Sequence, residues 1–568
     1  MSSGERRAIT AAFSHARRYK PLLPVLIALG VAGSLAESVG LSLIVLLLDL
    51  VLSPSQGIVT HGLLAGLQGV IERLVGHSSY VLAALILAFM FVRIVFNMAY
   101  GLISSHLRHA LSETMRARLL DAFLHMPYEH LHEQDAGTLH DTLALHSWAV
   151  ADTFTNVARM AANIGSIAIF GVFVFTLSAP ACILAAIGSA LLLLATSKLR
   201  LHAVRLGEAS LIVNAKLTER IWTTLQASRT VRAYARERWA QRYFDFASRS
   251  ARRNFQQIEQ MQILLYPVNE VGYLLLLGII ASTSMLFGTT ASSTFAAVLL
   301  LYRAQPLLRE LEANRLALAG HLASIDSVER QLAYVPLRRA DGNRPFVPPR
   351  HGIIFHDVRF SYTAEQPVLD GSSFRIAARG LTLLAGPSGT GKTTIVNLLL
   401  RLYEPQDGRI LVDDVPLAEI RRDDWLCHVS VAGQDTDLIP GTIRQNICLG
   451  RLNATDETLW HAVELAGIGD LIRTLPNGMR TTVGDRGTNL SGGQRQRIGL
   501  ARALVRDPAI LILDEATNAV ERTLEEEVLQ RIVAMRRDRV TILITHRQIE
   551  LRDDFHAIDL PTLRAAAT

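Results

Sequence analysis

The apolar residues of this 568-residue chain gather in its first half, in runs long enough to cross a bilayer as helices. Such a crossing takes about 20 apolar residues. The pattern predicts six spans, near residues 21–52, 81–104, 161–178, 179–197, 263–287 and 293–308. The third and fourth meet at Ser178, Ala179 and Pro180, so we predict a tight helical hairpin there.

The basic residues predict the orientation of these spans. Nearly all Lys and Arg of this half lie before the first span, between the second and third, and between the fourth and fifth. Because positive connections stay in the cytoplasm, both termini are predicted to be cytoplasmic. We therefore expect an integral membrane protein, in the inner (plasma) membrane of a bacterium.

The connections between the spans carry patterns of their own. Residues 107–159 and 199–260 read as helices that continue into the cytoplasm, each turning back through a short transverse segment near 137–146 and 218–226. In the outer connection, 53–79, apolar residues share one side of a helix. It is either an amphipathic helix lying on the outer membrane face or an ordinary capping helix.

The pattern changes after Arg330. Prolines and Gly342 mark a linker over 331–350, and from His351 onward short β runs alternate with helical stretches. The predicted fold is multidomain: an all-α six-helix transmembrane domain over 1–330 with long cytoplasmic helical extensions, then an α/β domain over 351–568. The loop 386–393 of the second domain reads Gly-Pro-Ser-Gly-Thr-Gly-Lys-Thr, a pattern typical of an α/β P-loop ATPase domain.

Composition agrees with a membrane protein that carries a soluble domain. Half of the residues are apolar and 19% are charged, and the mean hydropathy is +0.26. The net charge of +6 comes from arginines that flank the spans, so we expect no nucleic acid partner. The three cysteines form no pair motif, and neither a disulfide framework nor a zinc site is predicted.

The second half contains a phosphate-binding loop between a predicted strand, 381–385, and a predicted helix, 394–402. Its residues are Gly386, Pro387, Ser388, Gly389, Thr390, Gly391, Lys392 and Thr393. Glycines let successive backbone N–H groups turn toward phosphates. Lys392 is placed to reach the β- and γ-phosphates of ATP, and the Thr393 hydroxyl to bind Mg²⁺.

Further candidate residues follow short apolar strands. Asp514 and Glu515 end the strand 510–513: Asp514 can hold Mg²⁺ through water, and Glu515 can act as the general base on the attacking water. His546 follows the strand 540–544, where a γ-phosphate contact is needed. The amide of Gln434 is a candidate to sense Mg²⁺ or the attacking water.

These motifs, with Leu490, Ser491, Gly492, Gly493 and Gln494 between them, resemble ATP-binding-cassette (ABC) transporters. The membrane half is similar to the exporter type, a half-transporter with six spans and one cassette in one chain. The resemblance implies phosphate and Mg²⁺ contacts from Gly386, Ser388, Gly389, Gly391, Lys392, Thr393 and Thr394.

The same resemblance implies further roles for single residues. Tyr362 stacks on adenine, Gln434 signals to the membrane domain, and Ser491, Gly493 and Gln494 contact ATP held by the opposite subunit. Residues 483–487 resemble a cross-linking loop, Gly137 and Glu219 fall where coupling segments lie, and Pro306 matches a proline of the sixth span. Residues 518–521, Asn-Ala-Val-Glu, depart from the usual Ser-Ala-Leu-Asp, which puts the coupling between the two ATP sites in question.

Polar residues within the spans are the guide to the cargo. Glu37, Arg93, Asn97, Glu270 and Arg303 fall at or near membrane depth. They form either a polar translocation path or internal ion pairs, such as Glu37 with Arg93, that fix helix packing. For His125, His130 and His132 we favour a solvated helix face over a metal site.

The sequence therefore predicts ATP-driven export or flipping of an amphipathic solute, with ATP and Mg²⁺ as cofactors and membrane lipids as surroundings. The partner is a second copy or a related half-transporter, and the cargo is a peptide or a lipid or lipid-linked sugar. The alternative is a membrane-bound ATPase that gates or regulates without pumping; an intact Glu515 and His546 argue against it.

Overall fold

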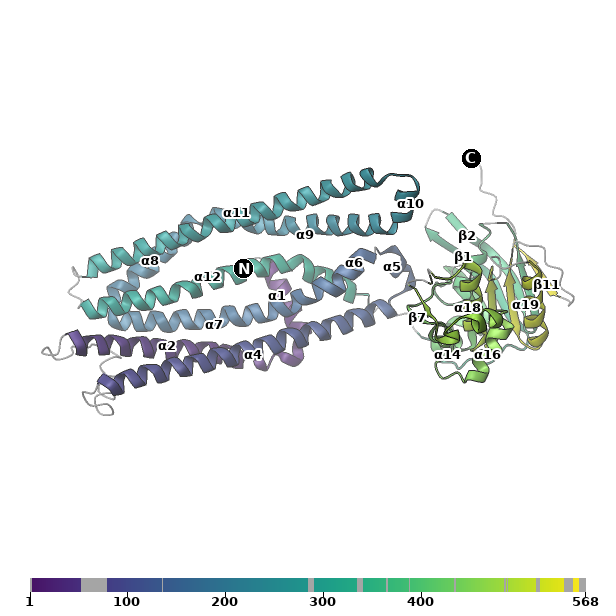
Figure 1. Cartoon of the computed structure of the whole chain (residues 1–568), viewed down its shortest axis with the longest axis horizontal. Coiled ribbons are helices and arrows are strands. Elements are labelled where there is room, and N and C mark those ends of the chain that lie inside the picture. The colour runs from purple at the N-terminus through teal and green to yellow at the C-terminus, as the bar shows by residue number, and fades with distance from the viewer. Residues whose placement is uncertain are drawn as a thin grey trace. The chain divides into compact units, whose positions relative to one another are not determined.

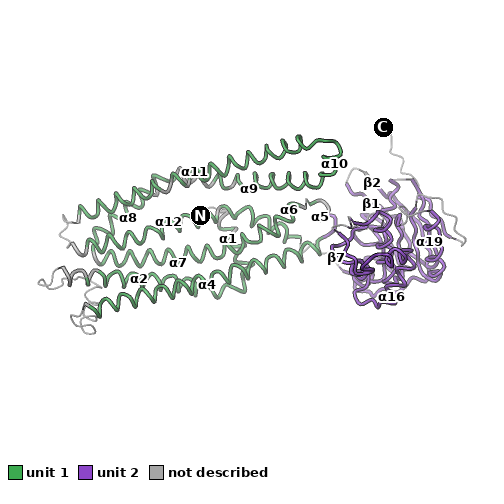
Figure 2. Tube along the Cα trace, in the orientation of Figure 1, with its two compact units in different colours: residues 1–126, 130–337 green, residues 127–129, 338–568 purple. Residues whose placement is uncertain are grey.

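The computed structural model describes residues 3–52, 79–134, 136–284, 291–334, 341–363, 366–387, 389–433, 436–484, 487, 489–516, 522–545 and 555–560. The chain forms two compact units (Figure 2). The first holds residues 1–126 and 130–337, and the second holds residues 127–129 and 338–568.

The first unit is helical (Figure 1). Its α-helices are α1 (Ser3–His15), α2 (Leu22–Leu52), α4 (Ser79–His125), α5 (Tyr128–Glu133), α6 (Ala136–Asp141), α7 (Ser147–Leu177), α8 (Ala179–Ala195), α9 (Ser197–Gln226), α10 (Ser228–Ala233), α11 (Glu237–Ser284) and α12 (Ala291–Leu332). A π-helical turn, Thr142–His146, joins α6 to α7. The outer connection predicted over 53–79 lies almost entirely outside the described residues.

The described part of each predicted apolar run falls in a long helix: α2, α4, α7, α8, α11 or α12. Among the described residues, three helical stretches are long and apolar enough to span a membrane, namely Leu22–Ile44, Tyr80–His125 and Gly137–Thr176. Two shorter apolar stretches are Ala179–Leu192 and Pro267–Thr283. The sixth run lies in α12, whose apolar part is interrupted by Arg303, Arg309 and Glu310.

The predicted hairpin between the third and fourth runs is confirmed. Ser178 alone separates α7 from α8, in an extended conformation (φ −156°, ψ 100°). Its side-chain oxygen accepts a hydrogen bond from the Ala181 backbone N–H at 3.3 Å, and Pro180 stands in the first turn of α8. An extended capping residue and an early proline are common at helix starts, so the local sequence sets this turn.

The short turning segments lie elsewhere than predicted. Thr218 to Gln226 form the last turns of the long helix α9, and the chain turns at α10 instead. The stretch contains no Gly or Pro to end the helix before Ala227. At the other connection α4 ends just before Pro127, and the short α5 follows, whereas 137–146 form α6 and the π-helical turn before α7.

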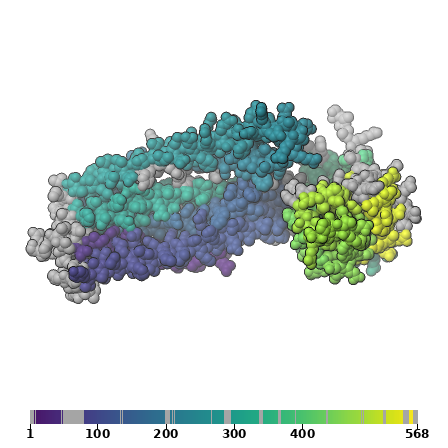
Figure 3. All heavy atoms as spheres, viewed as in Figure 1, coloured from purple at the N-terminus to yellow at the C-terminus, as the bar shows by residue number. Residues whose placement is uncertain are grey.

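Close approach of small residues packs α2 against α7. A Cβ added to Gly30 would come within 2.7 Å of Ala162 Cβ, and one added to Gly165 would come within 2.7 Å of Val31 Cγ2. The helix backbones are therefore near enough that neither glycine has room for a side chain. The long helices run side by side, and the space-filling view shows a hollow between the α9–α11 pair and the helices below it (Figure 3).

The described strands of the second unit form three sheets, and helices pack beside them (Figure 1). Its strands are β1 (Gly352–Thr363), β2 (Gln366–Ala377), β3 (Gly380–Ala385), β4 (Asp407–Val412), β5 (Val415–Pro416), β6 (Val429–Ala432), β7 (Gly441–Thr442), β8 (Thr482–Val483), β9 (Ile510–Asp514), β10 (Val540–Ile544) and β11 (Phe555–Asp559). Its α-helices are α13 (Lys392–Leu399), α14 (Arg422–His428), α15 (Ile443–Cys448), α16 (Asp456–Leu465), α17 (Gly469–Thr474), α18 (Gly492–Leu504) and α19 (Arg522–Met535).

The central sheet of this unit is parallel, in the order β11-β3-β10-β9-β6. A four-stranded antiparallel sheet, β2-β1-β4-β5, and the small pair β7-β8 complete the strands. Strands β9 and β10 are almost wholly buried, as their unbroken apolar runs predict for strands covered on both faces.

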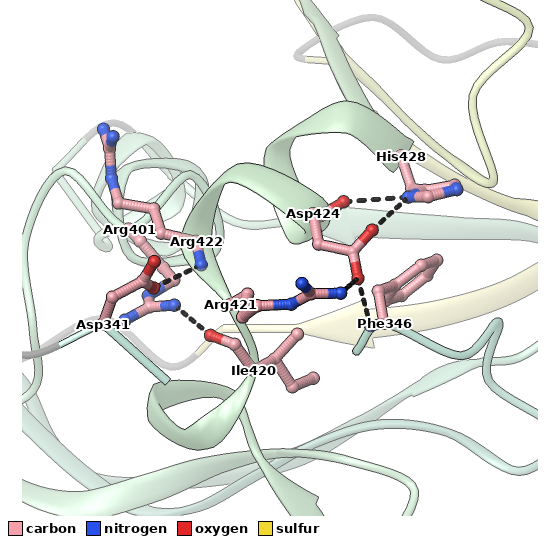
Figure 4. Close-up of polar contacts among 8 residues, drawn as sticks. All are labelled: Asp341, Phe346, Arg401, Ile420, Arg421, Arg422, Asp424 and His428. Carbon is pink, nitrogen blue, oxygen red and sulfur yellow. Dashed lines mark hydrogen bonds and ion pairs between the residues drawn. The ribbon is translucent and has the colours of Figure 1, made fainter. Parts of the chain in front are cut away.

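The described end of the predicted linker is docked on this unit (Figure 4). Asp341 accepts a hydrogen bond from the Arg422 backbone N–H at 2.6 Å, and Asp424 accepts one from the Phe346 N–H at 2.7 Å. Phe346 is buried against the rings of Trp425 and His428. Residues 341–346 are therefore packed rather than free, because an aromatic side chain in this segment finds an apolar partner.

Candidate functional site

The candidate residues of the second unit follow the carboxyl ends of parallel strands. The phosphate-binding loop comes after β3, and Asp514 ends β9. Gln434 follows β6 by two residues, and His546 follows β10 by two. Parallel strands end at a common edge of the sheet, which is where open α/β sheets bind ligands. The topology therefore brings four separate stretches of sequence to one edge.

The phosphate-binding loop has the backbone geometry that its glycines predict. Gly386, Gly389 and Gly391 have φ angles of 147°, 86° and 90°, which L side chains rarely adopt. At Gly391 an added Cβ would also come within 2.8 Å of Leu369 Cδ2. Gly391 is the N-cap of α13, so the loop leads directly into a helix N-terminus, a favourable place for phosphate.

The side chain of Lys392 binds the backbone of its own loop. Its Nζ donates to the carbonyl oxygens of Gly386 and Pro387, both at 2.7 Å. The pKa of Lys392 is lowered, because burial disfavours its charged form more than the fields of Glu515 and Asp514 favour it. The ammonium thus lies near both acidic candidates, although β10 separates β3 from β9 in the sheet.

Glu515 is held in an unusual backbone conformation. Its φ is 51°, in the left-handed region that non-glycine residues seldom occupy. Its N–H donates to the Ile544 carbonyl at 3.0 Å, and its carbonyl accepts from Gln496 Nε2 at 3.4 Å. Strain of this kind persists where the surroundings enforce it, often at functional sites. Gln496 is not predicted from the sequence, because its burial beside Glu515 is visible only in the fold.

Tyr362 is 46% exposed and anchored through its hydroxyl. That hydroxyl lies 3.2 Å from Thr394 Oγ1 and accepts from Asn397 Nδ2 at 3.1 Å. Both partners belong to α13, so the ring predicted to stack on adenine is tied to the helix of the phosphate-binding loop. Thr394, predicted to touch phosphate, is buried with its hydroxyl at Tyr362, whereas the Thr393 side chain is exposed.

The Ser-Gly-Gly-Gln segment begins α18 as a capping box. Ser491 Oγ accepts from the Gln494 N–H at 3.3 Å, and Gln494 Oε1 accepts from the Ser491 N–H at 2.9 Å. These residues are predicted to contact nucleotide, and the cap is an additional role that the pattern Ser-x-x-Gln could have indicated. Gly493, between them, is partly exposed.

Several predicted residues lie outside the described part of the chain. They are Ser388, Gln434 and His546, with Asp485 and Arg486 of the predicted cross-linking loop and the segment 518–521. The strands that lead to Gln434 and His546 are described, and both end at the edge that carries Glu515. The roles of these residues remain predictions from sequence.

The residues at this edge fit a bound Mg²⁺. Mg²⁺ usually takes one or two protein oxygens together with water and substrate phosphates. Thr393, with its exposed hydroxyl in the first turn of α13, and Asp514, at the end of β9, supply oxygens of that kind. Within the described residues there is no cluster of three His, Cys, Asp or Glu. A Mg²⁺ ion bound here would take its other ligands from water and the phosphates of the nucleotide.

The first unit holds a separate polar cluster. The predicted pair of Glu37 and Arg93 is present, with Arg93 Nε 3.0 Å from Glu37 Oε2. Arg303, whose pairing was not predicted, donates from Nε to Glu37 Oε1 at 2.5 Å. The cluster joins α2, α4 and α12. Its three members are far apart in the sequence, so the complete cluster can be recognised only from the packing of these helices.

Two family models match this chain. The model described as ABC transporter matches residues 369–518, and the model described as ABC transporter transmembrane region matches residues 25–304. The two matches lie in the order that an exporter-type half-transporter requires. This chain belongs to the ABC transporter family.

Individual relatives of this ABC transporter chain align with it over part of their length. An ABC transporter ATP-binding protein of Sinorhizobium fredii is 33% identical over 338 residues, which is 58% of each chain. The ATP-dependent lipid A-core flippase of Burkholderia orbicola is 41% identical over 213 residues, 37% of this chain and 36% of the flippase. Both alignments thus span less than two thirds of the relative.

Among solved structures, a bacterial Atm1-family ABC exporter with ATP bound is similar to this ABC transporter chain. The TM-score is 0.77 at 23% identity, and the likeness covers 94% of this chain and 91% of the exporter. At this identity the likeness establishes the fold: a helical transmembrane domain followed by a nucleotide-binding domain with sheets.

Proposed function

We propose that this protein hydrolyses ATP to export or flip an amphipathic solute across a membrane. One observation carries the proposal: a phosphate-binding loop, an acidic strand end and the strands leading to Gln434 and His546 share one sheet edge, in a chain whose other unit has apolar helices of spanning length. A nucleotide site fused to a membrane domain favours work across the membrane over simple gating.

The proposed chemistry assigns one task to each residue. The N–H groups of the loop and Lys392 bind the phosphates, and Glu515 takes a proton from the attacking water. His546 contacts the γ-phosphate, Gln434 orients the water, and Tyr362 stacks on the adenine. Bound Mg²⁺, held by Thr393 and Asp514 and sensed by Gln434, would supply charge neutralisation on the phosphates.

We propose that the working unit is a dimer, preferably of two identical chains. The sequence has one phosphate-binding loop and one Ser-Gly-Gly-Gln segment, and the resemblance places these two on opposite faces of a shared ATP. A second copy would therefore complete two equivalent sites, each with its own Glu515. A related half-transporter as partner is the alternative.

We further propose that the cassette is cytoplasmic and that the membrane is the inner membrane of a bacterium. The arginine-rich connections support this orientation. For the cargo we keep two classes, a peptide and a lipid or lipid-linked sugar. The similarity to a lipid A-core flippase over about a third of each chain supports the second.

The decisive variant is Glu515→Gln. Loss of the base with phosphate contacts retained should leave ATP binding near wild type and lower turnover at least about a hundredfold. The measurement is the ATPase rate of the full chain in lipid nanodiscs, with native mass spectrometry in detergent to detect an ATP-trapped dimer. Glu527→Gln, which removes an exposed carboxylate of α19, is the matched control and should turn over like wild type.

Two results would overturn the proposal. A rate within about threefold of wild type would remove Glu515 as the base. A stable monomer with full ATPase activity would remove the dimer. An ATPase that passes both tests but drives no ATP-dependent accumulation of labelled peptide or lipid in sealed vesicles would point to the gating alternative.

A further inference from the structure

The Glu37 cluster has more positive than negative charge. Glu37 of α2 is 8% exposed and stands between two guanidinium groups, Arg93 of α4 and Arg303 of α12. The Glu37 carboxylate thus has one oxygen near each arginine: Oε2 near Arg93 and Oε1 near Arg303. One carboxylate and two arginines leave a net charge of about +1.

This charge lies deep in the membrane-spanning part of the unit. Glu37 is midway along α2, between Leu22 and Leu52. Arg93 falls within the apolar stretch of α4, and Arg303 within the least polar part of α12. A net charge at such depth is costly unless it faces water or meets a counter-ion.

The described neighbours leave the excess charge uncompensated. The next acidic side chain along α12, Glu310, accepts from Asn163 at 3.2 Å and pairs with Arg159 at 3.5 Å. Glu310 and Arg159 thus balance each other. In the part of the chain that the structure describes, Arg93 and Arg303 have Glu37 as their recorded acidic partner.

The two arginines are also the accessible members of the cluster. Their side chains are 27% and 35% exposed, against 10% for the Glu37 side chain. Arg93 Nε is buried and lacks a hydrogen bond of good geometry. Guanidinium groups bind phosphate and carboxylate through paired N–H donors, and more strongly where water is scarce. The cluster therefore offers positively charged N–H donors that are available to a ligand.

We propose that Arg93 and Arg303 bind an anionic headgroup, a phosphate or a carboxylate, of the transported amphipath. Glu37 holds the two guanidiniums in place and competes with the ligand for them. The inference rests on the proposed function and narrows its cargo to amphipaths with an acidic head. A neutral glycolipid or a cationic peptide would lack the group that this cluster selects.

The test compares two probes that differ only in the headgroup. Dioctanoyl phosphatidic acid and dioctanoylglycerol are titrated by calorimetry into the full chain in nanodiscs of zwitterionic phosphatidylcholine. We expect the phosphate-bearing probe to bind at least about tenfold tighter, as a charge-assisted hydrogen bond predicts. Decanoate tests the carboxylate class, and inorganic phosphate tests whether the headgroup suffices without acyl chains.

Variants of the cluster give effects of opposite sign. Arg93→Gln or Arg303→Gln should weaken binding of the phosphatidic acid about tenfold or more, because a charged donor pair is lost. Glu37→Gln should tighten it, because the competing carboxylate is gone. Arg330→Gln, which neutralises an exposed arginine of the same helix, is the matched control and should bind like wild type.

A purely structural cluster predicts something else. Glu37→Gln would then weaken binding together with the arginine variants, and dioctanoylglycerol would bind as tightly as the phosphatidic acid; either result overturns the proposal. If Glu37→Gln fails to fold, Glu37→Asp, Arg93→Lys and Arg303→Lys retain the charges and must retain the anion preference. Equal affinities for both probes in an ATPase that remains sensitive to Glu515→Gln would reject this inference and leave the proposed function standing.

Discussion

The two polar sites of this molecule are built in different ways. In the cassette, the candidate residues lie at strand ends or at the first turn of a helix, and backbone geometry holds them. In the membrane unit, the Glu37 cluster joins side chains 266 residues apart, and long helices hold it. A site made of local motifs tolerates change in its surroundings. A site made of packed helices depends on their register.

The largest expected effect on ATP binding tests the local character of the cassette site. In Lys392→Ala the loop loses the ammonium that donates to Gly386 and Pro387 and that is proposed to reach the phosphates. We expect ATP affinity to fall by about tenfold or more. Calorimetric titration of the full chain measures it.

Lys216→Ala, at an exposed position of α9 in the other unit, is the control and should bind ATP like wild type. An unchanged affinity in Lys392→Ala would mean that the loop backbone alone binds the phosphates.

The next effect separates helix capping from nucleotide contact. Ser491→Ala and Thr442→Ala each remove the hydroxyl of a capping box, in α18 and in α15. Both should lower the stability of the cassette by about 1 kcal/mol. Only Ser491→Ala should also reduce ATPase activity. Thermal unfolding and the ATPase rate are measured on both variants. Equal ATPase rates would mean that Ser491 caps α18 but has no role in nucleotide contact.

A third, smaller effect is a loss of stability at low pH, which we expect from the hydrogen bonds of Asp413 at the start of β1. The pKa of Asp413 is lowered: burial alone would raise it, but hydrogen bonds from the N–H groups of Arg350, His351 and Gly352 outweigh burial. An Asp whose pKa is lower in the folded state than in the unfolded state stabilises the fold. This stabilisation is present at pH values above the unfolded-state pKa of about 3.9, and it is lost as the pH falls through the folded-state pKa.

Asp413→Asn lacks this contribution, so its free energy of unfolding at pH 7 should be about 1 kcal/mol lower than that of wild type. Its melting temperature should be lower as well. The gap between the two proteins should shrink as pH falls below about 4. Melting temperatures of the full chain across pH 7 to 3 measure it. A gap independent of pH would assign the difference to lost hydrogen-bond geometry rather than to charge.

The smallest effect concerns the departure at 518–521. Glu521 is one methylene longer than the usual Asp, so hydrogen bonds between the two ATP sites are expected to shift. Glu521→Asp should raise the ratio of cargo-stimulated to basal ATPase rate in nanodiscs. Because surface-loop substitutions usually change little, the increase should be modest. Glu527→Asp is the control, and equal ratios in the two variants would deny the departure a functional meaning.

The sequence predicts the local motifs of the cassette better than the contacts that depend on helix packing. The phosphate-binding loop, Asp514 and Glu515 were placed from the strand, turn and helix pattern around them, because parallel strand ends share an edge. The α7–α8 hairpin was predicted from Ser178 and Pro180 for the same local reason. Neither Arg303 as a partner of Glu37 nor Gln496 behind Glu515 was predicted, since both contacts depend on tertiary packing.

The turning segments show a further limit. An apolar and charged pattern continues through Thr218–Gln226 with no breaker, so the periodicity alone did not locate the end of α9. Helix ends are set by capping and by packing against neighbours, and the second is absent from a single sequence. At the other connection, Pro127 follows the end of α4, and a proline disfavours helical conformation in the residue before it.

The reciprocal bonds of Ser491 and Gln494 have a consequence for timing. In the proposed contact with nucleotide, these two side chains would lose less rotational freedom than unrestrained ones, because the cap already holds them. Under the proposed dimer, the start of α18 would therefore meet the nucleotide with its capping bonds already formed.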